Sequence, residues 1–174
     1  MKSKIIIAFI TAAIFSSYKS EAQLPHLSLY VHGLYASAID KSSQKFYHGG
    51  IGAVAGLTLG SKNTRAVASV GYTNFFSKQG NNNLPDEVYI PAKLGVREYL
   101  PLTLHMLYLQ GDLGVGFISN KNSANNVNRF AADIGAGVHL KALEAALIWD
   151  SFKESSPNGW SSWLTFQLGF NIGI

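Results

Sequence analysis

The sequence contains no cysteine, and charged residues make up only 14% of its 174 residues. The absence of cysteine excludes a disulfide framework and a lipidated N-terminal cysteine. The charged fraction lies well below the roughly 25% that is usual for soluble domains. Glycine is abundant instead, with 17 residues. Few charges and many glycines indicate a chain with a large face that does not meet water.

Several function classes find little support in this composition. The formal net charge of +4 is mild and gives no reason to expect a nucleic-acid partner. The five histidines are scattered and show no metal-ligand spacing, so we expect no metal and no cofactor. Gly135 and Gly137 are not followed by a helix, so they do not form a phosphate-binding loop. They are typical of small residues in a crowded, twisted sheet.

The N-terminal segment has the features of a cleavable signal peptide. Two lysines precede an apolar run at residues 5–15, which is too short for a membrane-spanning helix of about 20 residues. Ser20 and Ala22 place small residues at the −3 and −1 positions of a cleavage site. We therefore expect a signal peptide at residues 1–22 and a secreted mature chain at residues 23–174.

The end of the chain alternates strictly between apolar and small or polar residues from Leu164 onward. Because successive strand side chains point to opposite faces, this pattern predicts a strand with one apolar face. An apolar strand at a chain end is a sticky edge. A barrel removes that edge by pairing its last strand with its first, and in lipid it must do so.

Segments of the same alternating kind recur throughout the mature chain. The eight predicted strands are residues 27–37, 49–60, 65–76, 87–99, 106–119, 129–140, 143–152 and 160–174. The connections alternate between long polar stretches and short turns, as in barrels of the bacterial outer membrane. Residues 138–149 are rich in helix formers, but the flanking segments all have strand patterns, so we predict strand here as well. Pro91 lacks a ladder donor, so we expect a bulge there.

The final eight residues resemble the C-terminal insertion signal of bacterial outer-membrane β-barrels. That signal has a polar residue, a glycine two positions later and two alternate hydrophobic residues, which are here Gln167, Gly169, Ile172 and Ile174. The family usually ends in an aromatic residue, whereas this chain ends in isoleucine.

In strand number and pattern, the chain resembles the small eight-stranded outer-membrane barrel family that includes OmpX and the transmembrane domain of OmpA. The resemblance implies an all-β, eight-stranded antiparallel up-and-down transmembrane β-barrel in the bacterial outer membrane. It also implies outer-membrane lipid, lipopolysaccharide and the barrel-insertion machinery as partners. Members of the family range from structural proteins and adhesins to enzymes, so the fold does not decide the function.

The polar face of the predicted strands carries few charges, and these have both signs. Side chains fill the interior of an eight-stranded barrel, and an unpaired charge there is costly. We therefore expect Lys93 and Arg97 to pair inside the barrel with Asp112, Asp133 and Glu144. Such a polar plug leaves no wide pore.

Aromatic residues gather at the strand ends that the pattern assigns to the extracellular side. Outer-membrane barrels carry girdles of aromatic residues at the membrane interfaces. The predicted girdle consists of Tyr35, Tyr72, Phe117, Phe130, Trp149 and Trp160.

We expect a non-enzymatic structural or surface-interaction role, for which the sequence does not identify the ligand. Two alternatives remain. Lipid A acyltransferases and deacylases are small barrels that need a histidine-based site. His48, Asp150 and Ser151 resemble the acyltransferase set, while His26 and Ser28 have the deacylase spacing at the periplasmic end. The other alternative is a soluble secreted lipocalin-like carrier, in which the apolar face points inward.

Overall fold

The computed structural model describes residues 25–78, 86–101, 106–120, 127–154 and 159–174. The predicted signal peptide at residues 1–22 lies outside the described residues. No helix within the described part of the chain is long and apolar enough to cross a membrane. The elements in chain order are β1 (His26–Ala38), α2 (Lys41–Phe46), β2 (Tyr47–Gly60), β3 (Thr64–Ser77), β4 (Glu87–Tyr99), β5 (Leu107–Asn120), β6 (Val127–Leu140), β7 (Leu143–Lys153) and β8 (Trp160–Gly173).

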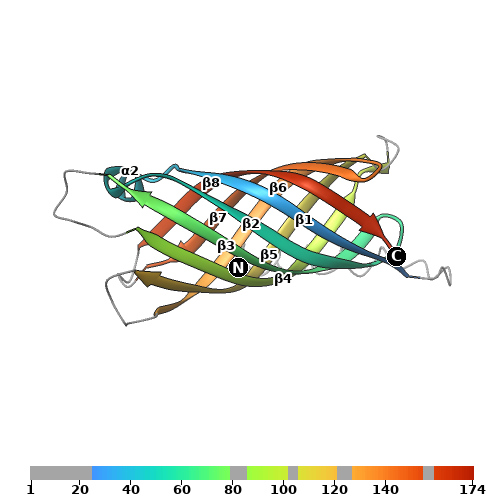
Figure 1. The fold of residues 1–174 in the computed structure, drawn as a ribbon. Coiled ribbons are helices and arrows are strands. Elements are labelled where there is room, and N and C mark those ends of the chain that lie inside the picture. The colour runs from blue at the N-terminus through green and yellow to red at the C-terminus, as the bar shows by residue number, and fades with distance from the viewer. Residues whose placement is uncertain (1–24, 79–85, 102–105, 121–126, 155–158) are drawn as a thin grey trace, which may run out of the picture.

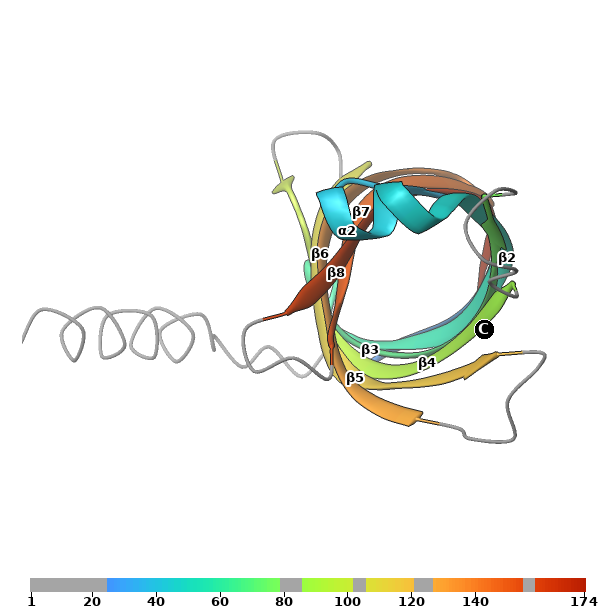
Figure 2. The ribbon, with the colours of Figure 1, turned by 90° about the vertical axis from the view of Figure 1, so that its left-hand side faces the viewer.

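The strands form a closed antiparallel barrel in which each pairs with its neighbours in sequence and β8 pairs with β1 (Figure 1). This confirms the predicted eight-stranded up-and-down topology. At one end of the barrel, here called the long-loop end, β1 leads to β2, β3 to β4, β5 to β6 and β7 to β8. The other end, here called the short-turn end, holds the start of β1 and the end of β8. Figure 2 looks into the long-loop end, where α2 lies along the rim.

The strand register fixes the tilt of the barrel. A row of paired residues that starts at Ser28 circles the barrel once and returns to β1 ten residues further along the chain, at Ala38. Its members in order are Ser28, Thr58, Val67, Gly95, Asp112, Asp133, Asp150, Trp163 and Ala38. With a rise of about 3.3 Å per residue and strands about 4.8 Å apart, this stagger tilts the strands by about 40°. Each successive residue of this row therefore lies nearer the long-loop end.

The two faces of each strand differ sharply in exposure. Leu94, Leu113 and Phe166 are 69%, 59% and 50% exposed on the outside, whereas Lys93 and Asp112 are 6% and 3% exposed inside. The apolar face thus points outward all round the barrel. A soluble lipocalin-like carrier has the opposite arrangement, so the structure excludes that alternative.

Within residues 138–149, the structure has strand at 138–140 and 143–149 and no helix, as predicted from the flanking segments. Leu140 at the end of β6 pairs with Leu143 at the start of β7 across a tight turn at Lys141 and Ala142. Val138 pairs with Ala145 in the same ladder. Pairing with β6 and β8 overrides the intrinsic helix propensity of this segment, as tertiary context often does.

The pattern left residues 38–48, between the first two predicted strands, as a loop-like connection, and the structure corrects this prediction. Residues Lys41–Phe46 form the short helix α2, capped by Asp40, whose Oδ2 accepts a 2.7 Å hydrogen bond from the backbone N–H of Ser43. Aspartate is a preferred N-cap residue because its carboxylate satisfies a free backbone donor of the first turn. A helix of this length has no apolar periodicity, so the sequence pattern did not reveal it.

The predicted bulge at Pro91 is absent. Val70 pairs with Ala92 and Thr73 with Tyr89, so the register between β3 and β4 is the same on both sides of the proline. The ladder is interrupted for two pairs instead, and the ring of Pro91 packs over Gly71, where a Cβ would lie 3.0 Å from Pro91 Cγ. Within the described strands, the register shift lies between Tyr47 and Gly49 of β2.

The alternation of connection lengths is also less regular than predicted. The turns at 61–63 and 141–142 are short, but β4 and β5 are joined by residues 100–106, which is no shorter than the connection 121–126 at the opposite end. Residues 102–105 lie outside the described part of the chain.

Candidate functional site

A buried ion pair occupies the half of the lumen nearer the short-turn end. Arg97 Nη1 lies 2.9 Å from Glu144 Oε1, and Arg97 Nε donates to Gln110 Oε1 at 2.8 Å. The guanidinium also lies between two tyrosine rings, at 4.1 Å from the centroid of Tyr108 and 5.2 Å from that of Tyr30. These contacts compensate a charge that the barrel withdraws almost completely from water.

Glu144 is the acceptor on which this half of the lumen converges. Its carboxylate accepts hydrogen bonds from Tyr108 Oη at 2.8 Å and Asn171 Nδ2 at 2.7 Å. Ring nitrogens of His32 and His139 each lie 3.4 Å from it. Because strands β1, β4, β5, β6 and β8 all supply partners, this one carboxylate joins most of the barrel wall.

A second group of charged residues lies in the lumen nearer the long-loop end. Lys93 Nζ lies 2.6 Å from Asp133 Oδ2 and 2.7 Å from Asp150 Oδ2. Asp112 precedes these two aspartates in the same row of paired residues and accepts a hydrogen bond from Gln110 Nε2. Gln110 therefore links the Arg97 group to the carboxylates of the Lys93 group.

The structure thus brings together all five residues that the sequence selected for the interior, in two linked groups. Asp150, which the sequence analysis placed in a catalytic alternative, is the second partner of Lys93. The sequence reasoning did not select the neutral members of the network. These are Tyr30, Tyr99, Tyr108, Gln110 and Asn171. All of them lie on the inward face of their strands, and the period-two alternation could have identified them by that position.

Glycines on neighbouring strands leave the space that the interior tyrosine rings occupy. A Cβ at Gly137 would collide with the ring of Tyr108, and a Cβ at Gly56 would collide with that of Tyr30. The glycines of the polar face are therefore packing residues for a crowded lumen, as their context in the sequence indicated.

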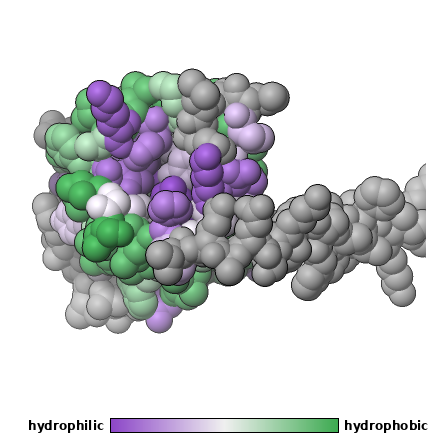
Figure 3. All heavy atoms as spheres, turned by 90° about the vertical axis from the view of Figure 1, so that its right-hand side faces the viewer, coloured by the Kyte–Doolittle hydropathy of each residue, from purple (hydrophilic) through white to green (hydrophobic). Residues whose placement is uncertain are grey.

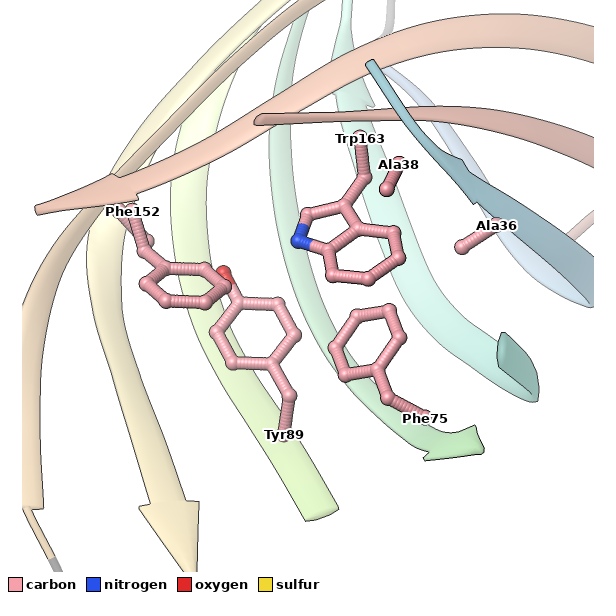
Figure 4. Packing of buried hydrophobic residues seen from close by; sticks show 7 residues of the cluster. Ala36, Ala38, Phe75, Tyr89, Phe152 and Trp163 are labelled. Carbon is pink, nitrogen blue, oxygen red and sulfur yellow. The ribbon is translucent and has the colours of Figure 1, made fainter. Parts of the chain in front are cut away.

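An aromatic layer closes the lumen toward the long-loop end (Figure 4). Phe75 stacks on Trp163 with ring centroids 4.0 Å apart, and Tyr89 contacts Phe152 at 5.0 Å. A cavity of about 40 Å³ lies between this layer and the Lys93 group and is lined by both. That volume has the size of a few ordered water molecules, whereas aqueous channels belong to much larger barrels.

The six aromatic residues of the predicted girdle are all exposed on the outside of the barrel. Trp160 and Phe130 lie next to each other, with ring centroids 6.2 Å apart and nearly perpendicular planes. The register places the set in the half of the barrel nearer the long-loop end, since each lies late in a strand that runs toward that end or early in one that leaves it. Their role at a membrane interface stays a prediction.

The residues of the catalytic alternative do not converge. Asp150 points into the lumen, whereas Ser151, next in the strand, faces outward and lies 2.9 Å from the hydroxyl of Ser162. His48 is on β2, which is not a neighbour of β7 in the barrel. The hydroxyl of Ser28 lies 2.7 Å from that of Thr58, so it is engaged with β2 rather than with His26. Within the described residues, no group of histidine and carboxylate side chains is arranged to hold a metal ion.

The four residues of the predicted insertion signal lie on the strand that closes the barrel. Gln167 and Gly169 face inward, and Gln167 Oε1 lies 3.3 Å from His32 Nδ1. Ile172 and Ile174 are exposed on the outside. Recognition by the insertion machinery remains a prediction from the resemblance.

Charges at the long-loop end are presented unequally. The described carboxylates there each accept a hydrogen bond from the chain itself, and all are partly buried. They are Asp40 (from Ser43 and Ser162), Asp86 (from Ser77), Glu87 (from Tyr47) and Glu154 (from Ser161). In contrast, Lys41, Lys45 and Lys153 are exposed. Among the described residues, the charges that this end exposes to a large ligand are therefore cationic.

Helix α2 holds two of these lysines on a fixed scaffold. Gln44 Nε2 donates to the backbone oxygen of Ala38 at 3.1 Å, and Lys78 Nζ donates to the backbone oxygen of Gln44. Asp40 joins α2 to β8, because its Oδ1 accepts from the N–H of Ser162 at 2.8 Å. Burial alone raises the pKa of Asp40, but the hydrogen bonds from Ser162 and Ser43 outweigh it and hold that pKa below its ordinary value.

A closed eight-stranded barrel with an apolar exterior and an ion-paired interior defines a small transmembrane barrel of the bacterial outer membrane. No protein-family model and no curated protein matches the chain. Solved structures do match it. Ail, the attachment invasion locus protein of Yersinia pestis, is similar with a TM-score of 0.53 and 11% identity, over 85% of this chain and 97% of that one.

Two further structures are similar to this chain. Neisserial surface protein A has a TM-score of 0.52 and 9% identity, over 85% of this chain and 96% of that one. Ail in complex with the heparin analogue sucrose octasulfate has a TM-score of 0.51 and 11% identity, over 85% and 97%. Identities this low show a shared fold. At that level they confirm the predicted resemblance in fold to small outer-membrane barrels.

Proposed function

We propose that this chain is a non-enzymatic surface-interaction protein of the outer membrane, which binds anionic polysaccharide at its long-loop end. The observation that carries the proposal is the unequal presentation of charge there. Lysines are exposed on α2 and at the end of β7, while every described carboxylate at this end of the barrel is partly buried and hydrogen-bonded by the chain. Exposed cations on a fixed scaffold attract a polyanion over a distance of about a Debye length.

Two further features support this function. The lumen is filled by paired charges and an aromatic layer, and this filling argues against a role as a solute channel. The outer wall is apolar and faces lipid, so the long-loop end is the surface left for ligands outside the cell. The similarity to Ail in complex with a heparin analogue favours a sulfated polysaccharide as the ligand class.

The test measures binding of fluorescent heparin to bacterial cells that carry the protein. The double variant Lys41→Gln and Lys45→Gln is expected to bind roughly five- to tenfold more weakly than the unchanged protein, because two exposed charge contacts are lost. Binding to the unchanged protein is expected to weaken as salt is added. The matched control is Lys62→Gln, which removes an exposed lysine at the short-turn end, out of reach of external heparin.

Heparin binding that is unaffected by the double variant, or insensitive to salt, would reject the proposal. The enzymatic alternative is tested on the same cells. If the protein is not an enzyme, the mass spectrum of lipid A stays unchanged in His48→Ala and Ser151→Ala. A change in lipid A acylation in both variants would favour the enzyme instead.

A further inference from the structure

A polar pocket of about 320 Å³ opens at the short-turn end of the barrel, away from the proposed polysaccharide surface. Figure 3 looks at this end and shows hydrophilic side chains gathered in the mouth, with hydrophobic ones around it. The polar side chains that line the pocket are those of His26, Ser28, Arg65, His139, Lys141 and Asn171. They come from β1, β3, β6, β8 and the turn between β6 and β7, so the pocket lies inside the mouth.

The lining of this pocket is cationic. It contains an arginine, a lysine and two histidines, but no aspartate or glutamate. Glu144 lies deeper in the lumen and is already engaged by Arg97, Tyr108 and Asn171.

Arg65 is the residue that most needs a counterion. It pairs directly across the ladder with Arg97, and like charges in opposite positions destabilise a sheet. Arg97 has its own carboxylate, whereas no ion pair of the described residues includes Arg65. The Nε of Arg65 is buried without a hydrogen-bond partner, and the face of Tyr99, 4.7 Å from its Cζ, compensates the charge in part.

Lys141 adds a second cation in a costly backbone conformation. Its φ of 60° lies in the left-handed region, which glycine or asparagine adopts more readily. A lysine in this turn costs on the order of 1 kcal/mol, and it places an ammonium group at the edge of the pocket.

We propose that this pocket binds an oxyanion, a phosphate or carboxylate group of a soluble periplasmic compound. Arg65 supplies the guanidinium fork that matches such groups, and Lys141 supplies a point charge. His26 contributes a ring nitrogen at the rim, and His139 is shared with Glu144. The pocket faces the lumen axis, so a soluble anion reaches it more directly than a lipid headgroup on the outer wall.

The experiment follows the side-chain NεH signal of Arg65 by NMR, with the protein in phosphatidylcholine nanodiscs. Titration with inorganic phosphate, and separately with acetate, is expected to give a saturable shift of this signal. Arg65→Gln, followed through the backbone signals of Lys141 and Ala142, is expected to raise the apparent Kd at least about tenfold, and Lys141→Gly about threefold. Lys141→Gly also suits the left-handed turn, so it removes the charge without unfolding the hairpin.

Two controls sharpen the result. Lys62→Gln, on the neighbouring turn outside the pocket lining, is expected to leave the Kd unchanged. Gly173→Glu is expected to abolish the response, because a Cβ at Gly173 meets nothing within 4 Å and its carboxylate would occupy the pocket. Heat-modifiable gel mobility reports whether each variant is folded.

An absent or non-saturable shift, or an equal response in folded Arg65→Gln, would overturn the proposal. Nanodiscs that contain phosphatidylglycerol distinguish the two sources of phosphate. If the Arg65 signal is already shifted there and free phosphate has no further effect, a lipid headgroup occupies the pocket and the assignment to a soluble anion is wrong. Failure of heparin binding at the other end leaves this result unaffected.

Discussion

Replacing Glu144 by alanine is expected to lower the free energy of unfolding by about 3–5 kcal/mol, the usual effect of breaking a buried ion pair. The variant leaves Arg97 without its carboxylate and removes the acceptor used by Tyr108 and Asn171. An uncompensated guanidinium inside a narrow barrel cannot reach water without displacing the tyrosines that cover it. The measurement is urea unfolding in lipid vesicles, followed by tryptophan fluorescence.

The matched control is Glu98→Ala. Glu98 is exposed on the outside of β4, between the inward-facing residues Arg97 and Tyr99, and it accepts a hydrogen bond from Thr64 Oγ1. Its removal is expected to cost no more than about 1 kcal/mol, as for other exposed polar contacts. A loss below about 1 kcal/mol in Glu144→Ala as well would mean that the lumen pairs do not hold the barrel together.

The second large effect is expected on the outer face. Leu94→Arg places a charge near the middle of β4, at a position that is 69% exposed in the structure. In a bilayer this substitution is expected to cost about 2–4 kcal/mol, because an arginine at the midplane must leave water. For a soluble barrel the same exposed position would accept arginine with almost no loss.

Leu140→Arg provides the depth control. Leu140 is also exposed on the outside, but it is the last residue of β6, beside the turn at Lys141. The cost there is expected to fall to about 0–1 kcal/mol, as it does near the membrane interface. Equal costs at both positions, measured by unfolding in vesicles, would contradict a lipid-facing wall.

Period-two alternation was enough to predict the strands, because each strand has one face in lipid and one in the lumen. It also selected Lys93, Arg97, Asp112, Asp133 and Glu144 as interior residues. Which charge meets which depends on the stagger of the barrel, and no single strand records that stagger. Asp150 is an example, because it lies on β7 and meets Lys93 of β4 only once the barrel has closed with this register.

Other features depended on contacts that are distant in sequence. The aromatic layer combines residues of β3, β4, β7 and β8, which share only their inward parity. Helix α2 is short, and its cap residue Asp40 also binds Ser162, far away in the chain. The charge difference at the long-loop end appears only when the hydrogen bonds of each carboxylate are known.

The most direct test of the whole account is the accessibility of spin labels along β4. The chain has no cysteine, so single cysteines at Ile90, Ala92, Leu94 and Val96 can be labelled without background. In vesicles, we expect collisions with oxygen to exceed those with a water-soluble nickel chelate at all four positions, and most strongly at Ala92 and Leu94. Collisions dominated by the nickel chelate at Leu94 would mean that this wall faces water, and the transmembrane barrel would be wrong.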